Sequence, residues 1–432
     1  MNHLVKWQVL LAAASAAFVL GTATPAFAAP TVRLSFLVDN NPQTTKAMEV
    51  VAADFMVKNP NIKIEIEARP AGAEGDNLIK TRLATGEMTD VFWYNVGSLF
   101  QALNPSRNLL DLSNEASQAN VLDTYKTVVS SGGRIYGVPG DTAQGGGILY
   151  NKKIYAKLGL NVPKTWEQFQ KNNAAIKTAG LVPVIQTYRD TWTSQLLVLG
   201  DFHNVQASEP GFSERYTQGK VKFATSAAAV KGFKHLEEVF KAGYLNKDFA
   251  SAGYEDGLRM LAKGEGAHYP MLTLSIAGLM ADHKASINDI GFFAIPGDDE
   301  AKNGLTAWMP AAVYIAKSTK HPVEAKKFLA YIASTEGCVS QTKAIGVTGP
   351  YMLKSCTLPE NIAPAVADLV SYFEPGAQNT PALEFLSPIK GPSLEQITVE
   401  VGSGIRKAAD AAALYDEDVR KQALQLGIVG WK

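Results

Sequence analysis

Aromatic and polar side chains gather at points where apolar runs of the sequence end. One group follows the apolar residues 32–38 and consists of Asp39, Asn40, Asn41 and Gln43; a second follows another apolar start and consists of Trp93, Tyr94 and Asn95. Flat aromatic faces together with carboxylate and amide groups bind a ligand that has both polar edges and apolar faces. These residues therefore predict a binding site.

Later in the chain, further acidic, amide and aromatic residues are candidates for the same site: Asp141, Gln144, Trp192, Tyr269, Trp308 and Tyr351. Because successive side chains of a strand point to opposite faces, one of Trp93 and Tyr94 is expected to face the core. For the asparagines the alternative role is helix capping, for Asp141 and Gln144 it is exposure in a loop, and for the aromatic residues it is core packing.

Catalytic motifs were searched for directly. The sequence contains no His-Glu-x-x-His, no Gly-x-Ser-x-Gly and no phosphate-binding loop, and the glycines at 264 and 266 lack the third glycine of a dinucleotide fingerprint. Its histidines show no metal-ligand spacing. We predict a binding protein without cofactor or metal, not an enzyme. A glycoside hydrolase stays open, since its two carboxylates can be distant in the chain.

Strands and helices alternate in the part of the chain that must position these residues. Residues 32–38 and 91–94 read as strands, residues 62–66 alternate isoleucine with charged residues, and residues 76–85 read as a helix closed by Gly86. This order predicts a mainly parallel α/β sheet, whose ligands bind outside the carboxyl ends of the strands.

Residues 136–168 form the most informative stretch. A strand is expected to stop at Pro139, the glycines at 145–147 to form an open loop, and residues 148–150 to form the next strand. Asn151 can cap a helix that ends at Gly159, and Thr165 with Gln168 forms a capping box.

Motifs in this stretch resemble the extracellular solute-binding proteins of ABC importers that bind sugars. The resemblance rests on Tyr-Gly-Val-Pro at 136–139, the three glycines, Tyr-Asn-Lys at 150–152, Pro163 and Thr-Trp-Glu at 165–167. A turn of Ser-Thr-Lys-His at 318–321 before a helix is similar to the family too. The chain departs from the family at Thr89, where proline is usual, and at residues 305–309, where glycines are common.

The resemblance implies a type II-like periplasmic binding protein fold, with two α/β lobes joined by a hinge and the ligand cleft between them. We expect a signal peptide at 1–28, the N-terminal lobe at 29–139 and 307–345, and the C-terminal lobe at 140–306 and 346–432. Residues 141–147 are then expected beside the cleft.

In function, the resemblance implies a monomer that captures a mono- or oligosaccharide by hinge closure and delivers it to an inner-membrane ABC permease. A sugar would use the aromatic and polar groups described above, through its C–H faces and its hydroxyl edges. Two alternatives remain: the same fold binding a polyol, a phosphorylated polyol, a polyamine or a metal complex, and a secreted glycoside hydrolase.

The N-terminal residues predict export. A positive charge at Lys6, an apolar run at 9–20 and Ala-Phe-Ala at 26–28 are typical of a secretory signal peptide. The apolar run is shorter than the roughly 18 residues of a membrane span, and the lack of a cysteine near the cleavage site excludes lipid anchoring there. We expect a periplasmic protein that begins at Ala29, is not inserted in the membrane and pairs Cys338 with Cys356; two free thiols are the alternative.

Charge is balanced, with 41 basic and 41 acidic residues. Because no basic run breaks this balance, nucleic acid and an anionic membrane surface are not expected as partners. At about 150 residues per domain, the length of 432 residues predicts two large domains.

Overall fold

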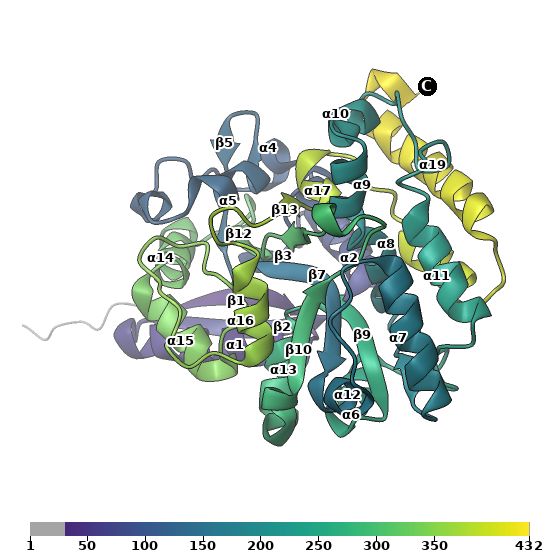
Figure 1. Ribbon diagram of the computed structural model, residues 1–432. Helices are drawn as coiled ribbons and strands as arrows, with labels where there is room; N and C mark the ends of the chain where they lie inside the picture. Colours follow the sequence, from purple (N-terminus) through teal and green to yellow (C-terminus); the bar gives the residue numbers. More distant parts are fainter. Residues whose placement is uncertain (1–30, 432) are drawn as a thin grey trace, which may run out of the picture.

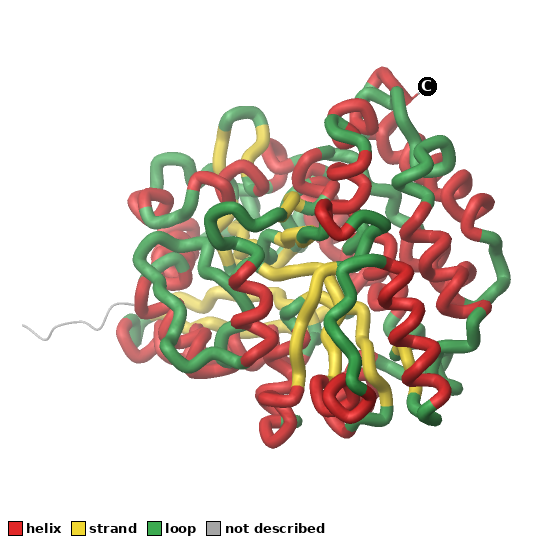
Figure 2. The backbone as a smooth tube through the Cα atoms, in the orientation of Figure 1, coloured by secondary structure: helices red, strands yellow, loops and turns green. Residues whose placement is uncertain are grey.

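The computed structural model describes residues 31–431, and Figures 1 and 2 show helices around two separate sheets. The predicted two-lobed α/β architecture is confirmed. Each lobe has its own core: one cluster of buried side chains lies around the first sheet, and three further clusters, one of them small, fill the second lobe. The predicted signal peptide at 1–28 lies outside the described residues.

The first sheet has the strand order β2-β1-β3-β12-β6. Its strands are β1 (Val32–Asp39), β2 (Ile62–Arg69), β3 (Val91–Tyr94), β6 (Gly137–Pro139) and β12 (Ala312–Ile315). β1 runs parallel to β2 and β3, which follow it through helical crossovers, whereas β12 is antiparallel to β3 and β6. The carboxyl ends of β1, β2 and β3 therefore meet at one edge of this sheet.

Helices α1 (Pro42–Lys58), α14 (Pro322–Ile332) and α15 (Thr335–Ile345) pack together in the first lobe (Figure 1). Phe55 of α1 and Phe328 of α14 anchor this packing with ring centroids 5.0 Å apart. The other elements before β6 are α2 (Gly72–Thr85), α3 (Ser98–Gln101), α4 (Pro105–Asn108), η1 (Ala116–Ala119), α5 (Asp123–Val128), β4 (Ser130–Ser131) and β5 (Arg134–Ile135).

The second sheet has the order β13-β11-β7-β9-β8, with β10 also on β7. Its strands are β7 (Gln144–Asn151), β8 (Val182–Val184), β9 (Gly266–Leu272), β10 (Ile290–Ala294), β11 (Leu305–Trp308) and β13 (Asn379–Pro381). β7 is antiparallel to β9, β10 and β11. The parallel arrangement predicted from residues 32–94 is found for β1, β2 and β3 of the first sheet, whereas the second sheet is mixed, with parallel pairs only between β8 and β9 and between β11 and β13.

The three glycines at 145–147 lie inside β7, so the predicted open loop is wrong. Side chains from other elements occupy the space beside each of them. A Cβ on Gly145 would meet Leu369, one on Gly146 would overlap the Trp308 ring, and one on Gly147 would meet Phe292. These residues are glycine because neighbouring side chains pack against the strand backbone.

The helix caps predicted for the residues after β7 are confirmed. Asn151 caps α6 (Lys152–Leu158) by accepting a hydrogen bond from the Ile154 amide at 3.1 Å, and Gly159 ends that helix in a left-handed conformation. Thr165 and Gln168 form the capping box of α7 (Trp166–Thr178).

The other helical elements fall into two groups along the chain. Between α7 and β11 lie η2 (Thr191–Gln195), α8 (Leu196–Leu199), α9 (Phe202–Ser208), α10 (Phe212–Thr217), α11 (Lys231–Lys241), α12 (Tyr254–Lys263), α13 (Ser275–Asp282), η3 (Lys284–Asp289) and η4 (Glu300–Lys302). After α15 come α16 (Pro364–Ser371), α17 (Leu383–Leu386), α18 (Leu394–Gly402), α19 (Ala408–Gln425) and η5 (Val429–Trp431).

Three segments connect the lobes: residues 140–143, 309–311 and 346–363. The third segment contacts the first core again at Met352 and Leu353 before α16 begins. The connections are hydrogen-bonded to one another and to nearby side chains: the Ala143 amide donates to the Pro350 carbonyl at 2.7 Å, and the Tyr125 hydroxyl donates to the Pro310 carbonyl at 3.1 Å. The predicted disulfide between Cys338 and Cys356 is present and ties the third connection to α15.

The lobe boundaries are best drawn from the sheets. β11 pairs up to Trp308 in the second sheet, and Met352 and Leu353 belong to the first core. The boundaries expected from the sequence instead place residue 307 in the first lobe and residues 346–432 in the second. We propose that the first return falls at 309–311 and that the third connection reaches the second lobe only after Cys356. Among residues 31–431, no helix has the length and apolar character of a membrane span.

Candidate functional site

A cavity of about 620 Å³ lies between the lobes and is lined by residues of both. Its walls include the carboxyl ends of β1, β2 and β3, the connections at 140–143 and 309–311, and the loop before α18. Small-molecule sites typically have volumes of about 300 to 1,000 Å³, so the cavity is large enough for a ligand of that class.

The structure brings most of the predicted residues together. The cavity is lined by Asp39, Asn41, Gln43, Trp93, Asn95, Asp141, Gln144, Trp192 and Trp308. Four predicted residues do not line it: Asn40, Tyr94, Tyr269 and Tyr351.

Each of these four has another position. Tyr94 is fully buried in the first core, because its neighbour on β3, Trp93, takes the face toward the cavity. Tyr269 is buried in the second lobe, where its hydroxyl is 2.8 Å from that of Thr187. Asn40 accepts a hydrogen bond from the Ala71 amide at 3.2 Å, and the hydroxyl of Tyr351 bonds that of Thr342.

The end of β1 and the start of α1 form one wall. Asn41 caps α1 by accepting hydrogen bonds from the amides of Gln43 at 3.0 Å and Thr44 at 3.2 Å, so the capping alternative is correct for this residue. Asp39 accepts from the Asn41 amide at 3.1 Å, and burial raises the pKa of this carboxyl against the opposing charge of Arg69. The helix N-terminus and a carboxylate thus lie side by side in the cavity.

Two tryptophan rings are positioned by glycines. Trp93 lies against Gly140 and Trp308 against Gly146, in each case so closely that a Cβ on the glycine would overlap the ring. The Trp308 indole N–H also donates to Glu384 at 2.7 Å. Packing against a glycine therefore fixes each ring at a position where it lines the cavity.

Glu384 connects Trp308 to a buried lysine. Its second oxygen accepts from Lys390 at 2.8 Å, and both side chains are about 15% exposed. Burial alone would lower the pKa of Lys390, but the Glu384 carboxylate outweighs it and the pKa is raised. Lys390 thus stays charged in the cavity wall.

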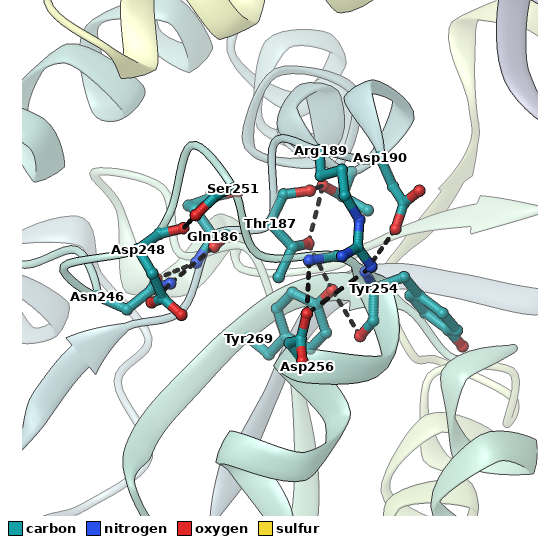
Figure 3. A network of polar contacts seen from close by, with 12 residues as sticks. Gln186, Thr187, Arg189, Asp190, Asn246, Asp248, Ser251, Tyr254, Asp256 and Tyr269 are labelled. Atoms are coloured by element: carbon teal, nitrogen blue, oxygen red, sulfur yellow. Dashed lines mark hydrogen bonds and ion pairs between the residues drawn. The ribbon is translucent and has the colours of Figure 1, made fainter.

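Trp192 lies in η2, directly after a loop at residues 186–190 that is held by hydrogen bonds from other elements; Figure 3 shows this loop and its partners. Asn246 bonds the backbone of Gln186 through both its oxygen and its nitrogen, at 2.8 and 3.1 Å, and Asp190 accepts from the Tyr254 amide at 2.6 Å. The Trp192 ring lies 5.4 Å from that of Tyr254 between centroids. The Tyr269 hydroxyl bonds the Thr187 hydroxyl of the same loop, so Tyr269 helps to hold this loop in place without lining the cavity itself.

Several charged residues of the cavity were not predicted: Arg69, Asp76, Lys80, Lys390, Glu384 and Glu395. Arg69 ends β2, and the rule that ligands bind at carboxyl ends of parallel strands would have found it. The others lie on α2 or in the 384–395 segment, where the sequence carries no signal that they face a cavity.

The arrangement is suited to binding. Three tryptophans supply apolar faces, and amides and carboxylates supply hydrogen bonds. Within the described chain, no group of three or more His, Cys, Asp or Glu side chains could hold a metal ion.

Comparison with known proteins identifies relatives. Residues 41–337 match the sequence profile of the bacterial extracellular solute-binding proteins. The multiple sugar-binding protein of Streptococcus mutans is 25% identical over 296 residues, which are 66% of this chain and 68% of that protein.

Solved structures of similar shape cover nearly the whole chain. A chitin oligosaccharide binding protein superimposes with a TM-score of 0.78 at 20% identity, covering 91% of this chain and 99% of the other. The structure of SBP RafE in complex with raffinose gives a TM-score of 0.74 at 23% identity, with coverages of 89% and 98%. At these identities the likeness establishes the fold.

Proposed function

The chain belongs to the bacterial extracellular solute-binding protein family, and we propose that it captures a mono- or oligosaccharide in the periplasm and delivers it to the permease of an ABC importer. The observation that carries the proposal is the cavity between the lobes, where Trp93, Trp192 and Trp308 meet amide and carboxylate groups. The similar proteins include a multiple sugar-binding protein, a chitin oligosaccharide binding protein and a protein in complex with raffinose, and these names support the same substrate class.

The size of the cavity supports a ligand larger than a single ring. Its volume of about 620 Å³ lies well inside the range of about 300 to 1,000 Å³ typical of small-molecule sites, so a saccharide of more than one ring has room. Closure of the lobes about the connections at 140–143, 309–311 and 346–363 would complete the enclosure.

Among the alternatives, a phosphorylated polyol is disfavoured, because the basic residues of the cavity already face acidic ones: Arg69 faces Asp39, and Lys390 binds Glu384. The excess of carboxylates instead favours a polyamine as the second candidate. A hydrolase would turn over an oligosaccharide, so product formation separates it from a receptor.

The test is a thermal-shift screen of the chain from Ala29 onward against mono- and oligosaccharides, polyols, polyamines and phosphates, followed by calorimetry. At a ligand concentration 100 times the dissociation constant, binding stabilises the protein by about 2.7 kcal/mol. The proposal expects a saccharide to bind without being cleaved. Binding of polyamine or phosphate alone, or cleavage of the saccharide, would overturn it.

Matched tryptophan variants locate the binding. Trp93→Ala and Trp192→Ala should each weaken saccharide binding at least tenfold while unfolding remains cooperative. The control is Trp166→Phe, because Trp166 lies outside the cavity and bonds Glu238 at 2.8 Å. If both cavity variants bind as tightly as the control, the proposed platforms are wrong.

A further inference from the structure

Asp141 differs from the other acidic residues of the cavity in having no basic neighbour. Asp39 is influenced by Arg69, Asp76 by Arg69 and Lys80, and both Glu384 and Glu395 by Lys390. The charged group that acts on Asp141 within the described chain is another carboxylate, that of Asp39.

The position of Asp141 is well defined by the chain around it. The preceding residue, Gly140, is bonded on both sides: its amide donates to the Ala311 carbonyl at 3.0 Å, and its carbonyl accepts from the Gln341 side chain at 2.9 Å. Asp141 itself accepts from the Thr142 amide at 2.7 Å. The carboxylate is therefore a fixed part of the cavity wall.

Two neighbouring carboxylates repel each other when both are ionised, and burial strengthens this repulsion. Burial, together with a smaller contribution from the nearby Asp39 carboxylate, raises the pKa of Asp141 to about 6. The hydroxyl groups near Asp141 are neutral: that of Thr142 donates to the carboxylate at 3.4 Å, and burial and the aspartate raise the pKa values of Tyr125 and Tyr351. A ligand group that carries positive charge would relieve this repulsion, whereas a neutral hydroxyl would not.

An aromatic ring lines the same part of the cavity as Asp141. The Trp93 ring packs against Gly140, the residue next to Asp141, and both Trp93 and Asp141 line the cavity. A cation over a tryptophan face is attracted by the ring, more strongly where water is excluded. A carboxylate next to a tryptophan is thus a suitable site for an ammonium group.

We propose that the preferred ligand is an amino sugar, a saccharide with a protonated primary amine that binds Asp141 and packs against Trp93. This inference rests on the proposed function and names the substrate class of the same cavity. The tryptophans select a ring with apolar faces over a flexible polyamine, and the unpaired carboxylate selects the ring that carries the amine.

The experiment compares matched ligands by calorimetry at pH 6.5 and low salt. The probes are glucose, glucosamine and N-acetylglucosamine, their β-1,4-linked disaccharides, the galactose counterparts, and spermidine. The amine form of the best-binding series should bind at least tenfold more tightly than both the hydroxyl and the N-acetyl form, which is about 1.4 kcal/mol. Raising the salt to 0.5 M should reduce this preference.

The outcomes separate the two proposals. If a neutral saccharide binds as tightly as its amine form or more so, the amino-sugar inference fails and the proposed function stands. If none of the saccharides binds, or if spermidine alone binds, both fail.

A charge-removing variant tests the role of the carboxylate. Asp141→Asn keeps the shape and should reduce the preference for the amine form to less than threefold. The control is Asp123→Asn, because Asp123 is an exposed residue of α5 that pairs with Lys126 at 2.8 Å, far from the cavity lining. A tenfold preference that persists in Asp141→Asn, with cooperative unfolding intact, would contradict the assignment.

Discussion

Gly146 allows the sharpest test of how the cavity is built. It lies in the middle of β7, paired with Thr306 on one side and Leu272 on the other, and the Trp308 ring lies where its Cβ would be. In Gly146→Ala the ring must shift, since the strand backbone is held by neighbours on both sides. Overpacking of this kind costs about 1–3 kcal/mol.

Displacement of the ring has a second cost. The Trp308 N–H donates to the Glu384 carboxylate at 2.7 Å, and a hydrogen bond to a charged group contributes about 1.5–3 kcal/mol. The free energy of unfolding should therefore fall by about 2.5–6 kcal/mol, and saccharide affinity should fall with it.

The assay is urea unfolding of four proteins: the natural chain, Gly146→Ala, Trp308→Ala and the double variant. Once the ring is removed, the added methyl group has space, so Gly146→Ala should cost less than about 1 kcal/mol in that background. A coupling energy of at least about 1 kcal/mol is expected for residues in contact. Equal costs of Gly146→Ala in both backgrounds would refute the packing argument.

Three further predictions concern stability. Glu384→Gln should lower the free energy of unfolding by about 3 kcal/mol at pH 7, because it leaves the Lys390 charge buried without its partner; an unchanged urea midpoint would contradict this. Burial raises the pKa of Asp201 from 3.8 to about 7, so the folded state holds this proton more tightly and its stabilising effect is present below pH 4 and lost as the pH rises through 7. Asp201→Asn should therefore gain stability relative to the natural chain between pH 4 and pH 8, and a difference that does not change with pH would refute the argument. Replacing Cys338 and Cys356 together by alanine should cost about 3 kcal/mol relative to the oxidised natural protein. The reduced natural protein is the control and should show the same loss, and an unchanged urea midpoint in the variant would contradict the prediction.

Local signals in the sequence were sufficient for several elements. The cap at Asn151 and the capping box of Thr165 and Gln168 depend on residues three or four apart, and the structure has both. The alternation of side chains on β3 likewise separated Trp93 from Tyr94, although it did not say which of them faces the cavity.

Contacts between distant residues explain what sequence patterns missed. The sequence pattern indicates a loop at the glycines of β7, because the side chain that packs against Gly146, that of Trp308, comes much later in the chain. Glu384, Lys390 and Glu395 reach the cavity only because the chain after the third connection returns to the cleft, which no local pattern indicates. In contrast, Arg69 was missed although its place at the end of a parallel strand could have identified it.

The most direct test of the central claim, that the cavity between the lobes binds a saccharide, is a crystal structure of the chain bound to the tightest saccharide found in the screen. The account predicts a sugar ring against Trp93, Trp192 or Trp308, with its polar groups on Asp39, Asp141 or their neighbours. A saccharide bound elsewhere on the molecule, with this cavity holding water alone, would contradict it.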